Sequence, residues 1–450
     1  MSNAELADDE RYVITGYETV TPLGLDKVTS WQNLVSGQHG LRHVSETHLA
    51  KHEELGIMKS QVVGALPNEF EATLRAEPIL MNDTYNYKEL VRYSHLSAQV
   101  AGLVVHRAMR EAGVLQADSS KLNPEIVDPY RTDLYIGSTF AGVSTLAEFD
   151  PQNVRATDLF KTLFGRVASV PANIADIRRR AVVVDVECAS GSITFDMAVD
   201  ALQKKVKGDY AVDLVVAAGV DAGLPPRGVE MFEGMGEEGV DTRDDPEVVS
   251  RPFDKNRHGL VMGEGGGAFV IERLSSAKAR GLTDEQIIAE LVATRSYTHA
   301  ESRVQAGLEG AQRGLEELIE ASGLTAEELL YINNHATSTG VGDTNEAKIT
   351  KLAVASRNLA PQKVYANSTK GATGHALGGA GAIEAGFAIE ALLHGETPPG
   401  LKLTEPEEDM AHFNLSALES TKADLDVVIS ISLGFGGSFA GIALRKYVGR

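Results

Sequence analysis

The chain has 450 residues, enough for two or three domains, and 43% hydrophobic against 23% charged residues suits a protein with a large buried core. Its formal net charge of −21 disfavours nucleic acid as a partner, because such a field repels phosphate. A single cysteine excludes an internal disulfide and a multi-cysteine zinc site, so we expect a reducing, cytoplasmic environment.

Neither the beginning nor the interior of the chain suggests contact with a membrane. Residues 1–11 are acidic and lack the basic and apolar regions of a secretory signal. No apolar run reaches the roughly 18 residues that suggest a membrane span. The sequence therefore predicts a protein that works outside the bilayer.

Short apolar stretches alternate with helix-like segments along the chain. Runs such as AVVVDV and DLVVAAG lack polar alternation, as do strands that are covered on both faces. This alternation predicts an α/β architecture with helices on both faces of the sheet. The predicted strands are residues 12–16, 133–137, 182–187, 213–219, 267–272, 288–293, 331–334, 364–367, 427–433 and 441–446, and predicted helices include 89–112, 192–206 and 311–322.

The predicted strands divide evenly into two groups with the same rhythm. Five strands fall within residues 1–284 and five within residues 285–450, which indicates an internal duplication and gives the two predicted domains. Residues 44–86 and 141–177 fit the alternation poorly, so we interpret them as insertions that cap the core.

Cys188 lies between the apolar run AVVVDVE and the helix-like segment ASGSITFDMAVDALQKK. The small residues Ala189, Ser190 and Gly191 permit a tight turn from strand to helix. A thiol at a helix start meets unpaired N–H groups and the positive end of the dipole, which lowers its pKa. Taken alone, an isolated cysteine is more often a small buried residue than a nucleophile.

His335 ends a predicted strand in YINNHATSTGVGDTNEA, and the helix that follows carries Glu346. Ligands of α/β proteins bind at the carboxyl ends of strands, which makes His335 a candidate for function. A structural hydrogen-bonding role for this histidine is equally compatible with the motif.

His375 lies in the glycine-rich segment VYANSTKGATGHALGGAGAIEAG, five residues after Lys370 and nine before Glu384. The segment has no G-K-[ST] ending, which disfavours a phosphate-binding loop. The stretch GEGGGAF at residues 263–269 runs into a strand rather than a helix, which disfavours a dinucleotide site.

Phe435 stands between glycines in SLGFGGSFAG. The segment is either a simple turn or a place where a backbone N–H faces an oxyanion while the ring closes a channel. No HExxH, EF-hand or C₂H₂ pattern occurs in the chain, so no metal is predicted.

Together these segments resemble the elongating β-ketoacyl-acyl carrier protein synthases of the thiolase superfamily, over about residues 12–448. The shared motifs, in family order, are TPLG, SRPFDKNRHGLVMGEG, HATSTGVGD, STKGATGH followed by GGAGAIE, and LGFGG. The resemblance implies a thiolase-like fold of two duplicated βαβαβαββ halves, layered α-β-α-β-α, and a homodimer. Two histidines are typical of the elongating type, and Cys188 argues against a non-catalytic partner subunit.

The resemblance implies a decarboxylative Claisen condensation that extends an acyl chain by two carbons in fatty acid biosynthesis. The acyl group would pass from the phosphopantetheine arm of an acyl carrier protein to Cys188, and His335 and His375 would bind the malonyl thioester oxygen. No metal or other cofactor is implied. The remaining implied roles are orientation of the histidines by Lys370 and Glu384, an oxyanion hole from the N–H groups of Cys188 and Phe435, a gate at the Phe435 ring, and pantetheine contacts from Thr337 and Thr339.

Some positions depart from the family pattern. Ala336 and Leu433 replace residues near the chemistry without removing a catalytic group. Glu237 and Glu238 stand where related enzymes often place a basic residue that docks the acidic carrier. On a chain of charge −21 this predicts a specialised or secondary-pathway synthase. The basic clusters at residues 178–180 and 204–207 are either a substitute docking patch or solvated faces.

Alternative functions follow from the same motifs. A polyketide-type ketosynthase with a dedicated carrier protein fits them almost as well as fatty-acid elongation. A catalytically silent partner that shapes the product tunnel is the alternative outside the enzymes. A thiolase fits less well, because that branch usually has a second cysteine near the end of the chain.

Overall fold

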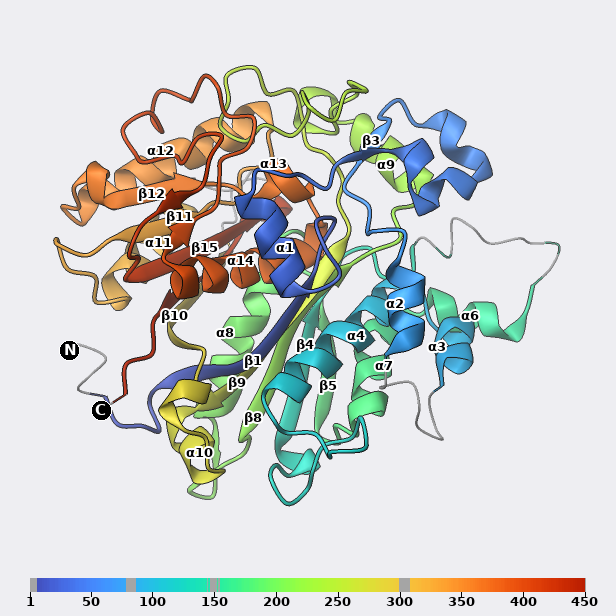
Figure 1. Cartoon of the computed structure of the whole chain (residues 1–450), viewed down its shortest axis with the longest axis vertical. Helices are drawn as coiled ribbons and strands as arrows, with labels where there is room; N and C mark the ends of the chain where they lie inside the picture. Colours follow the sequence, from blue (N-terminus) through green and yellow to red (C-terminus); the bar gives the residue numbers. More distant parts are fainter. Residues whose placement is uncertain are drawn as a thin grey trace.

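A computed structural model of the chain describes residues 6–77, 86–143, 145, 152, 154–298 and 308–449. Its core is one sheet in the order β12-β11-β15-β16-β10-β1-β9-β8-β4-β5 (Figure 1). Each stretch that we predicted as a strand contributes one strand to this sheet. The strands are β1 (Tyr12–Val20), β4 (Thr132–Gly137), β5 (Arg180–Val184), β8 (Leu214–Asp221), β9 (Gly265–Arg273), β10 (Ala289–Thr298), β11 (Leu330–Asn333), β12 (Val364–Asn367), β15 (Val427–Gly434) and β16 (Ser438–Arg445).

The sheet consists of two halves with the same topology. Counted along the chain within each half, both halves have the strand order 3-2-4-5-1 from the outer edge inward. In both, the three outer strands are parallel and the next two pairings are antiparallel. The inner strands β1 and β10 pair antiparallel and join the halves. This repeat confirms the duplicated α/β fold, while a boundary between residues 284 and 285 stays a prediction.

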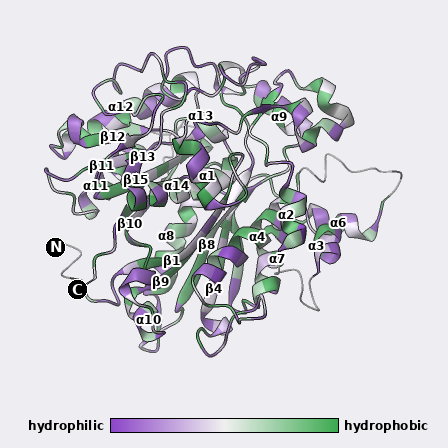
Figure 2. Ribbon diagram, viewed as in Figure 1, coloured by the Kyte–Doolittle hydropathy of each residue, from purple (hydrophilic) through white to green (hydrophobic). Residues whose placement is uncertain are grey.

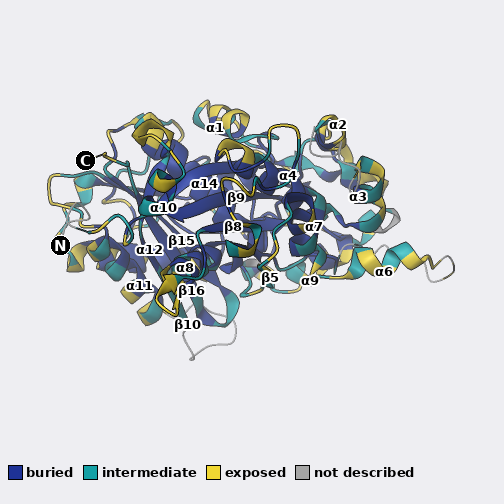
Figure 3. Ribbon diagram, turned by 90° about the horizontal axis from the view of Figure 1, so that it is seen from below, coloured by how far each residue is buried: buried dark blue, intermediate teal, exposed yellow. Residues whose placement is uncertain are grey.

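Helices α8 (Ser190–Gln203) and α14 (Ala380–His394) form the central layer. Both pack against strands of both halves and against each other. Residues 380–392 of α14 are buried on every side, as its apolar sequence AGAIEAGFAIEALLH requires. Figure 3 shows α14 in the dark interior of the molecule, whereas α8 is only partly buried, and Figure 2 shows the hydrophobic strands around these helices.

Further helices cover the outer faces of the sheet. Helix α4 packs on β1, β8 and β9, and α11 packs on β10 and β16. The remaining elements are α1 (Lys27–Val35), α4 (Leu96–Glu111), α7 (Arg166–Ala175), α10 (Leu274–Ala279), α11 (Leu308–Ala321), α12 (Gly340–Ser356), α13 (Lys370–Thr373), and the two-stranded pairs β6 (Lys205–Val206) with β7 (Asp209–Tyr210) and β13 (Glu396–Thr397) with β14 (Thr421–Lys422).

Short elements from the two predicted insertions lie on one side of the core (Figure 1). Within the predicted bounds they are β3 (Val62–Val63), the 3₁₀ turns that precede it, α2 (Phe70–Ala76) and α6 (Ala156–Thr162). β2 (Arg42–His43) and α3 (Tyr87–Tyr93) lie directly outside the first predicted insertion. Within the second predicted insertion, α7 packs on α4, β4 and β5. Residues 78–85, 144, 146–151 and 153 lie outside the described residues.

Two predicted helices differ from the structure at a boundary. The predicted helix 89–112 is two helices, because the His95 imidazole accepts the Ala98 N–H at 3.2 Å and starts α4 anew. The predicted helix 192–206 ends at Gln203, since Lys205 and Val206 form β6. Periodicity alone predicts neither break.

Backbones approach one another closely at the centre of the fold. A Cβ atom at Gly137, the last residue of β4, would lie 2.2 Å from the carbonyl carbon and oxygen of Ser190. A Cβ atom at Gly191 would lie 2.8 Å from the carbonyl oxygen of Gly378. Glycine is therefore required here, and it fixes the start of α8 against β4 and against the segment that leads into α14.

Candidate active site

Cys188 lies on a tight turn between β5 and α8. The chain leaves the sheet at Val184, three residues earlier than predicted, and Glu187 adopts a left-handed φ of +51°. Such a conformation is strained for a residue other than glycine. Ser190 holds the turn, because its hydroxyl accepts the Val186 N–H at 2.9 Å and donates to the Glu187 carbonyl at 2.5 Å. The sulfur is thereby fixed just before the first turn of α8.

Both predicted catalytic histidines lie next to this sulfur. The Nε2 atom of His375 is 3.0 Å from the Sγ atom of Cys188. The rings of His335 and His375 meet edge to face with centroids 5.1 Å apart. One nitrogen of each ring and the Sγ atom all lie within 4.8 Å of one another. Residues separated by up to 187 positions in the sequence thus form one cluster.

The duplicated fold explains why these residues meet. Cys188 follows β5 and precedes α8, and His375 follows β12 and precedes α14, so the two occupy equivalent places in the two halves. His335 follows β11, the strand that pairs with β12. The central helices α8 and α14 pack together, and their starts bring the thiol and the imidazole into contact.

Buried acidic groups and one lysine surround the histidines. Lys370 and Glu384, with 1% and 2% of their side chains exposed, form a direct ion pair. Glu346 of α12 accepts the backbone N–H groups of His335 and Ala336, each at 2.6 Å. The sequence places Glu346 on the helix after His335 and assigns it no role. Its signal was an acidic residue one to two turns into a helix that begins directly after the catalytic loop.

Burial sets the protonation of the cluster. Burial raises the pKa of the Cys188 thiol to about 12, although the Lys370 ammonium lowers it. The sequence had predicted a lowered pKa, and that prediction was wrong because apolar side chains enclose the sulfur. Burial, followed by Lys370, also holds the pKa of His335 and of His375 well below its usual value. Both imidazoles are therefore neutral at physiological pH.

The hydrogen-bond partners indicate which nitrogen carries the proton. The Nδ1 atoms of His335 and His375 are buried and accept or donate no hydrogen bond within the described part of the chain. A proton on Nδ1 would bury a donor without an acceptor, which is costly. The Nε2–H tautomer instead gives His375 the sulfur as its partner, and it makes both rings hydrogen-bond donors toward the space beside Cys188.

A cavity of about 330 Å³ leads to this cluster. The hydroxyls of Thr337 and Thr339, predicted contacts of the pantetheine arm, lie on its wall 3.3 Å apart. The Phe435 ring also lines it and lies 6.3 Å, between centroids, from the Phe232 ring. The other lining residues are Met235, Glu238, Leu260, Ala336, Val341, Gly342, Asp343, Asn345, Glu346, Ile349, Leu433 and Gly434.

Two models of known protein families match this chain. Residues 9–277 match the beta-ketoacyl synthase N-terminal domain, and residues 288–404 match the beta-ketoacyl synthase C-terminal domain. The chain belongs to the beta-ketoacyl synthase family. It is therefore an acyltransferase of the condensing type.

Relatives in the beta-ketoacyl synthase family match nearly the whole chain. The 3-oxoacyl-[acyl-carrier-protein] synthase 2 of Rhizobium meliloti (strain 1021) is 30% identical over 98% of this chain and 99% of its own. The enzyme of the same name from Vibrio harveyi is 29% identical over 97% and 98%. Among solved structures, a beta-ketoacyl synthase from Burkholderia phymatum STM815 superposes with a TM-score of 0.80 at 25% identity, over 97% of this chain and 100% of that one.

The two basic clusters of this synthase lie away from the catalytic cavity. Arg178 pairs with Asp176 at 2.9 Å, and Arg179 forms an ion pair with Asp133. Residues 204–207 follow the end of α8, so they lie about 20 Å from its start at the rise of an α-helix. Neither cluster contributes a residue to the cavity lining.

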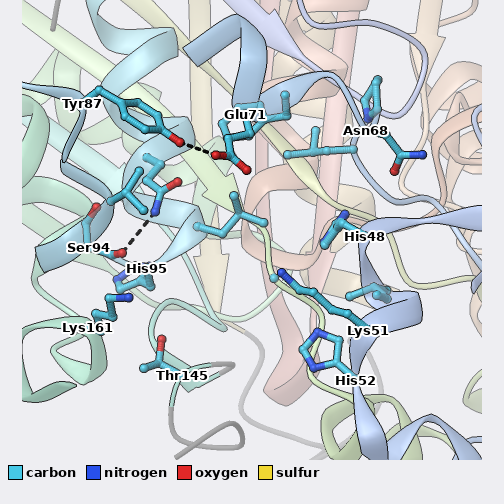
Figure 4. A pocket seen from close by; sticks show the side chains of 18 of the residues that line it. His48, Lys51, His52, Asn68, Glu71, Tyr87, Ser94, His95, Thr145 and Lys161 are labelled. Atoms are coloured by element: carbon cyan, nitrogen blue, oxygen red, sulfur yellow. Dashed lines mark hydrogen bonds between the residues drawn. The ribbon is translucent and has the colours of Figure 1, made fainter. Parts of the chain in front are cut away.

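A second and larger cavity, of about 800 Å³, lies between α2, α3, α6 and the 3₁₀ turn His48–Lys51 (Figure 4). Polar groups such as Lys51, His95 and Lys161 face it, and it contains none of the catalytic cluster. The Nε2 atom of His48 lies 3.4 Å from a carboxylate oxygen of Glu264. Burial alone would raise the pKa of Glu264, but its contacts with His48 and with backbone N–H groups lower that pKa to about 2. This cavity is separate from the condensation site.

We expect the stability of this synthase to fall with rising pH because of Glu346. Burial, then the nearby Asp343, raises its pKa to about 8, so the folded state holds a proton that the unfolded chain releases near its ordinary pKa. The stabilisation is present below that ordinary value and is lost as the pH rises through about 8. Melting temperatures of Glu346→Gln should therefore change less than those of the wild type between about pH 6 and about pH 9.

An exposed residue of the same kind provides the control for this pH effect. Glu309→Gln on α11 removes a carboxylate at the surface and should leave the pH dependence of the melting temperature unchanged. An equal slope in Glu346→Gln and the wild type would show that this buried carboxyl does not titrate on unfolding.

Proposed function

We propose that this enzyme joins a Cys188-bound acyl chain to malonyl by decarboxylative condensation, which makes it a 3-oxoacyl synthase of the elongating type. The observation that carries the proposal is the contact of 3.0 Å between His375 Nε2 and Cys188 Sγ, with His335 beside them at the end of a cavity. The named relatives act with acyl carrier protein, which supports the same carrier here. No metal or redox cofactor is needed, since loss of carbon dioxide drives the reaction.

In the first step the Cys188 sulfur attacks the thioester carbonyl of an acyl chain on a pantetheine arm. The bond from carbon to the pantetheine sulfur breaks, and that sulfur takes the proton that Cys188 gives up. Donation from His375 Nε2–H and the start of α8 stabilise the transient thiolate against its burial. Backbone N–H groups of Cys188 and Phe435, two residues that line the cavity, would donate hydrogen bonds to the oxyanion.

In the second step malonyl thioester occupies the same cavity. The Nε2–H groups of His335 and His375 donate to its thioester oxygen, so the negative charge left by departing carbon dioxide is held as an enolate. The enolate carbon attacks the acyl carbonyl on Cys188, and the bond from that carbon to the sulfur breaks. One proton is taken up and ends on the Cys188 thiol. A neutral imidazole that carries its proton on Nε2 can donate one hydrogen bond to this oxygen.

The neighbouring residues position this machinery. Burial, followed by the Lys370 ammonium, keeps the pKa of both histidines low and the rings neutral, and Glu384 pairs with Lys370. The hydroxyls of Thr337 and Thr339 would contact the pantetheine arm. A homodimer stays a prediction of the family resemblance. Within the described residues β5 is the last strand on its side of the sheet, with Arg180 and Ala181 exposed, and such an edge is one that a second copy can extend.

Mass spectrometry of the intact protein tests the proposal. Incubation with a medium-chain acyl carrier should add one acyl group to the wild type and none to Cys188→Ala, and malonyl carrier should then release a product two carbons longer. Cys188→Ser is a matched variant that keeps the volume but lacks the thiolate. Acylation that persists in Cys188→Ala would contradict the assignment of the nucleophile.

The number of extensions seen in these products distinguishes fatty-acid elongation from polyketide synthesis. A single extension of a saturated chain supports fatty-acid elongation, whereas repeated extension without reduction supports a polyketide-type ketosynthase. A titration with a standard fatty-acid carrier tests whether the enzyme is specialised, since an ordinary affinity would contradict that hypothesis.

A further inference from the structure

The acidic residue Glu238 lines the catalytic cavity, as do Thr339, Val341 and Asn345 at the start of α12. One of its carboxylate oxygens accepts the Val341 N–H at 2.8 Å. Val341 belongs to the first turn of α12, where unpaired N–H groups and the helix dipole favour a negative charge. The carboxylate is therefore fixed on the cavity wall instead of pointing into bulk solvent.

No cationic side chain of the described residues pairs with Glu238. Within the described part of the chain, no lysine, arginine or histidine comes within ion-pair distance of its carboxylate. Arg257 approaches the same turn of α12, but its guanidinium donates to the carbonyls of Thr339 and Gly340 at 2.7 and 2.6 Å and pairs with Glu407 at 2.6 Å. An anionic group that enters this cavity thus meets an unneutralised carboxylate.

We propose that Glu238 determines specificity by charge. It disfavours acyl donors whose arm carries several negative charges, such as coenzyme A thioesters. Donors whose arm is neutral where it passes Glu238 are not affected. The inference rests on the proposed function. A pantetheine arm is neutral along its amides and carries charge only at its phosphate end. A carrier-borne arm brings a single phosphodiester there, whereas coenzyme A brings a diphosphate and a further phosphate.

Coulomb repulsion sets the size of the expected effect. Several charges about a nanometre from one carboxylate, in partly screened surroundings, correspond to about three- to tenfold in the rate of acylation. The glutamine of Glu238→Gln still accepts the Val341 N–H through its amide oxygen, so this substitution removes the charge and keeps the cap. The acceleration caused by Glu238→Gln should become smaller as salt is added, because the carboxylate and the phosphates of the donor both lie near solvent.

The experiment compares two donors of the same acyl chain, one on coenzyme A and one on pantetheine without phosphate, by the rate of Cys188 acylation in intact-mass measurements. Glu238→Gln should accelerate the coenzyme A donor about three- to tenfold and leave the pantetheine donor unchanged. The matched control is Glu230→Gln, which removes the same charge from an exposed position on α9 (Pro226–Glu233) outside the cavity lining.

Each outcome decides the question. Equal acceleration in Glu238→Gln and Glu230→Gln would assign the effect to net charge, and equal change with both donors would assign it to structure; either overturns the proposal. Acylation by coenzyme A that stays undetectable in both forms overturns it as well. Failure of the pantetheine donor with the wild type would instead contradict the proposed function, so the two failures are distinguishable.

Discussion

Replacing His335 with alanine is expected to slow condensation about 10²–10³-fold while leaving acyl transfer to Cys188 almost unchanged, since each lost oxyanion donor costs about that factor. His335 has its ring 5.1 Å from that of His375 and forms no hydrogen bond to the sulfur. Its Nε2–H is needed when the malonyl thioester develops negative charge, which occurs only in the second step.

His375→Ala should behave differently, because His375 Nε2 lies 3.0 Å from the Cys188 sulfur. Loss of this donor removes support for the thiolate in acylation and for the enolate in decarboxylation. Both steps should therefore slow, each by about 10²-fold or more. The pair of variants forms its own control, because one side chain touches the nucleophile and the other does not.

Two measurements separate the steps. The rate of Cys188 acylation follows from intact mass in a single turnover, and the release of carbon dioxide from labelled malonyl carrier reports decarboxylation. Equal acylation rates in the two variants would contradict the roles that the geometry assigns. Unchanged release of carbon dioxide in His335→Ala would remove His335 from the enolate site.

Much of the fold could be predicted from the sequence, because buried strands have an apolar signal of their own. All the predicted stretches contribute strands, and the duplication appears as a repeated strand order. The positions of Cys188, His335 and His375 could also be predicted, since each follows a strand and precedes a helix or turn. Topology then brings the ends of these elements together.

Other features depend on burial and on side-chain contacts that a linear pattern does not contain. The thiol pKa was predicted in the wrong direction, because the helix start is local whereas the apolar enclosure of Cys188 comes from residues such as Leu224 and Met262 elsewhere in the chain. The role of Glu346 depends on two backbone N–H groups that only the folded loop presents. The break before α4 depends on one capping contact of His95.

The two halves keep the same architecture but carry different chemistry at equivalent places. The position between the third strand and the central helix holds the nucleophile in the first half and an imidazole in the second. Only Cys188 forms a covalent bond in the proposed reaction, whereas His375 assists both steps. Duplication followed by divergence at one turn therefore supplies two complementary groups at the meeting point of α8 and α14.

Lys370→Met is expected to destabilise the protein by about 3–5 kcal/mol, because it leaves Glu384 buried without its partner. The two side chains are almost fully enclosed and form a direct ion pair. Burial raises the pKa of Glu384 to about 7, and Lys370 opposes that rise. Replacing both partners, as in Lys370→Met with Glu384→Leu, removes both charges and should restore most of the free energy of unfolding measured in denaturant.

The double variant should still differ from the wild type in its pH dependence. The Lys370 ammonium contributes to the lowered pKa of both catalytic imidazoles. Without it those pKa values rise, the imidazoles become protonated at a higher pH, and the acid limb of the condensation rate moves upward in pH. Arg11→Met is the matched control, since Arg11 forms a buried pair with Glu290 away from the cavity. Arg11→Met should lower stability about as much as Lys370→Met alone, without moving the acid limb. A shift of the acid limb in Arg11→Met equal to that of the double variant would show that the shift does not depend on the charge beside the histidines.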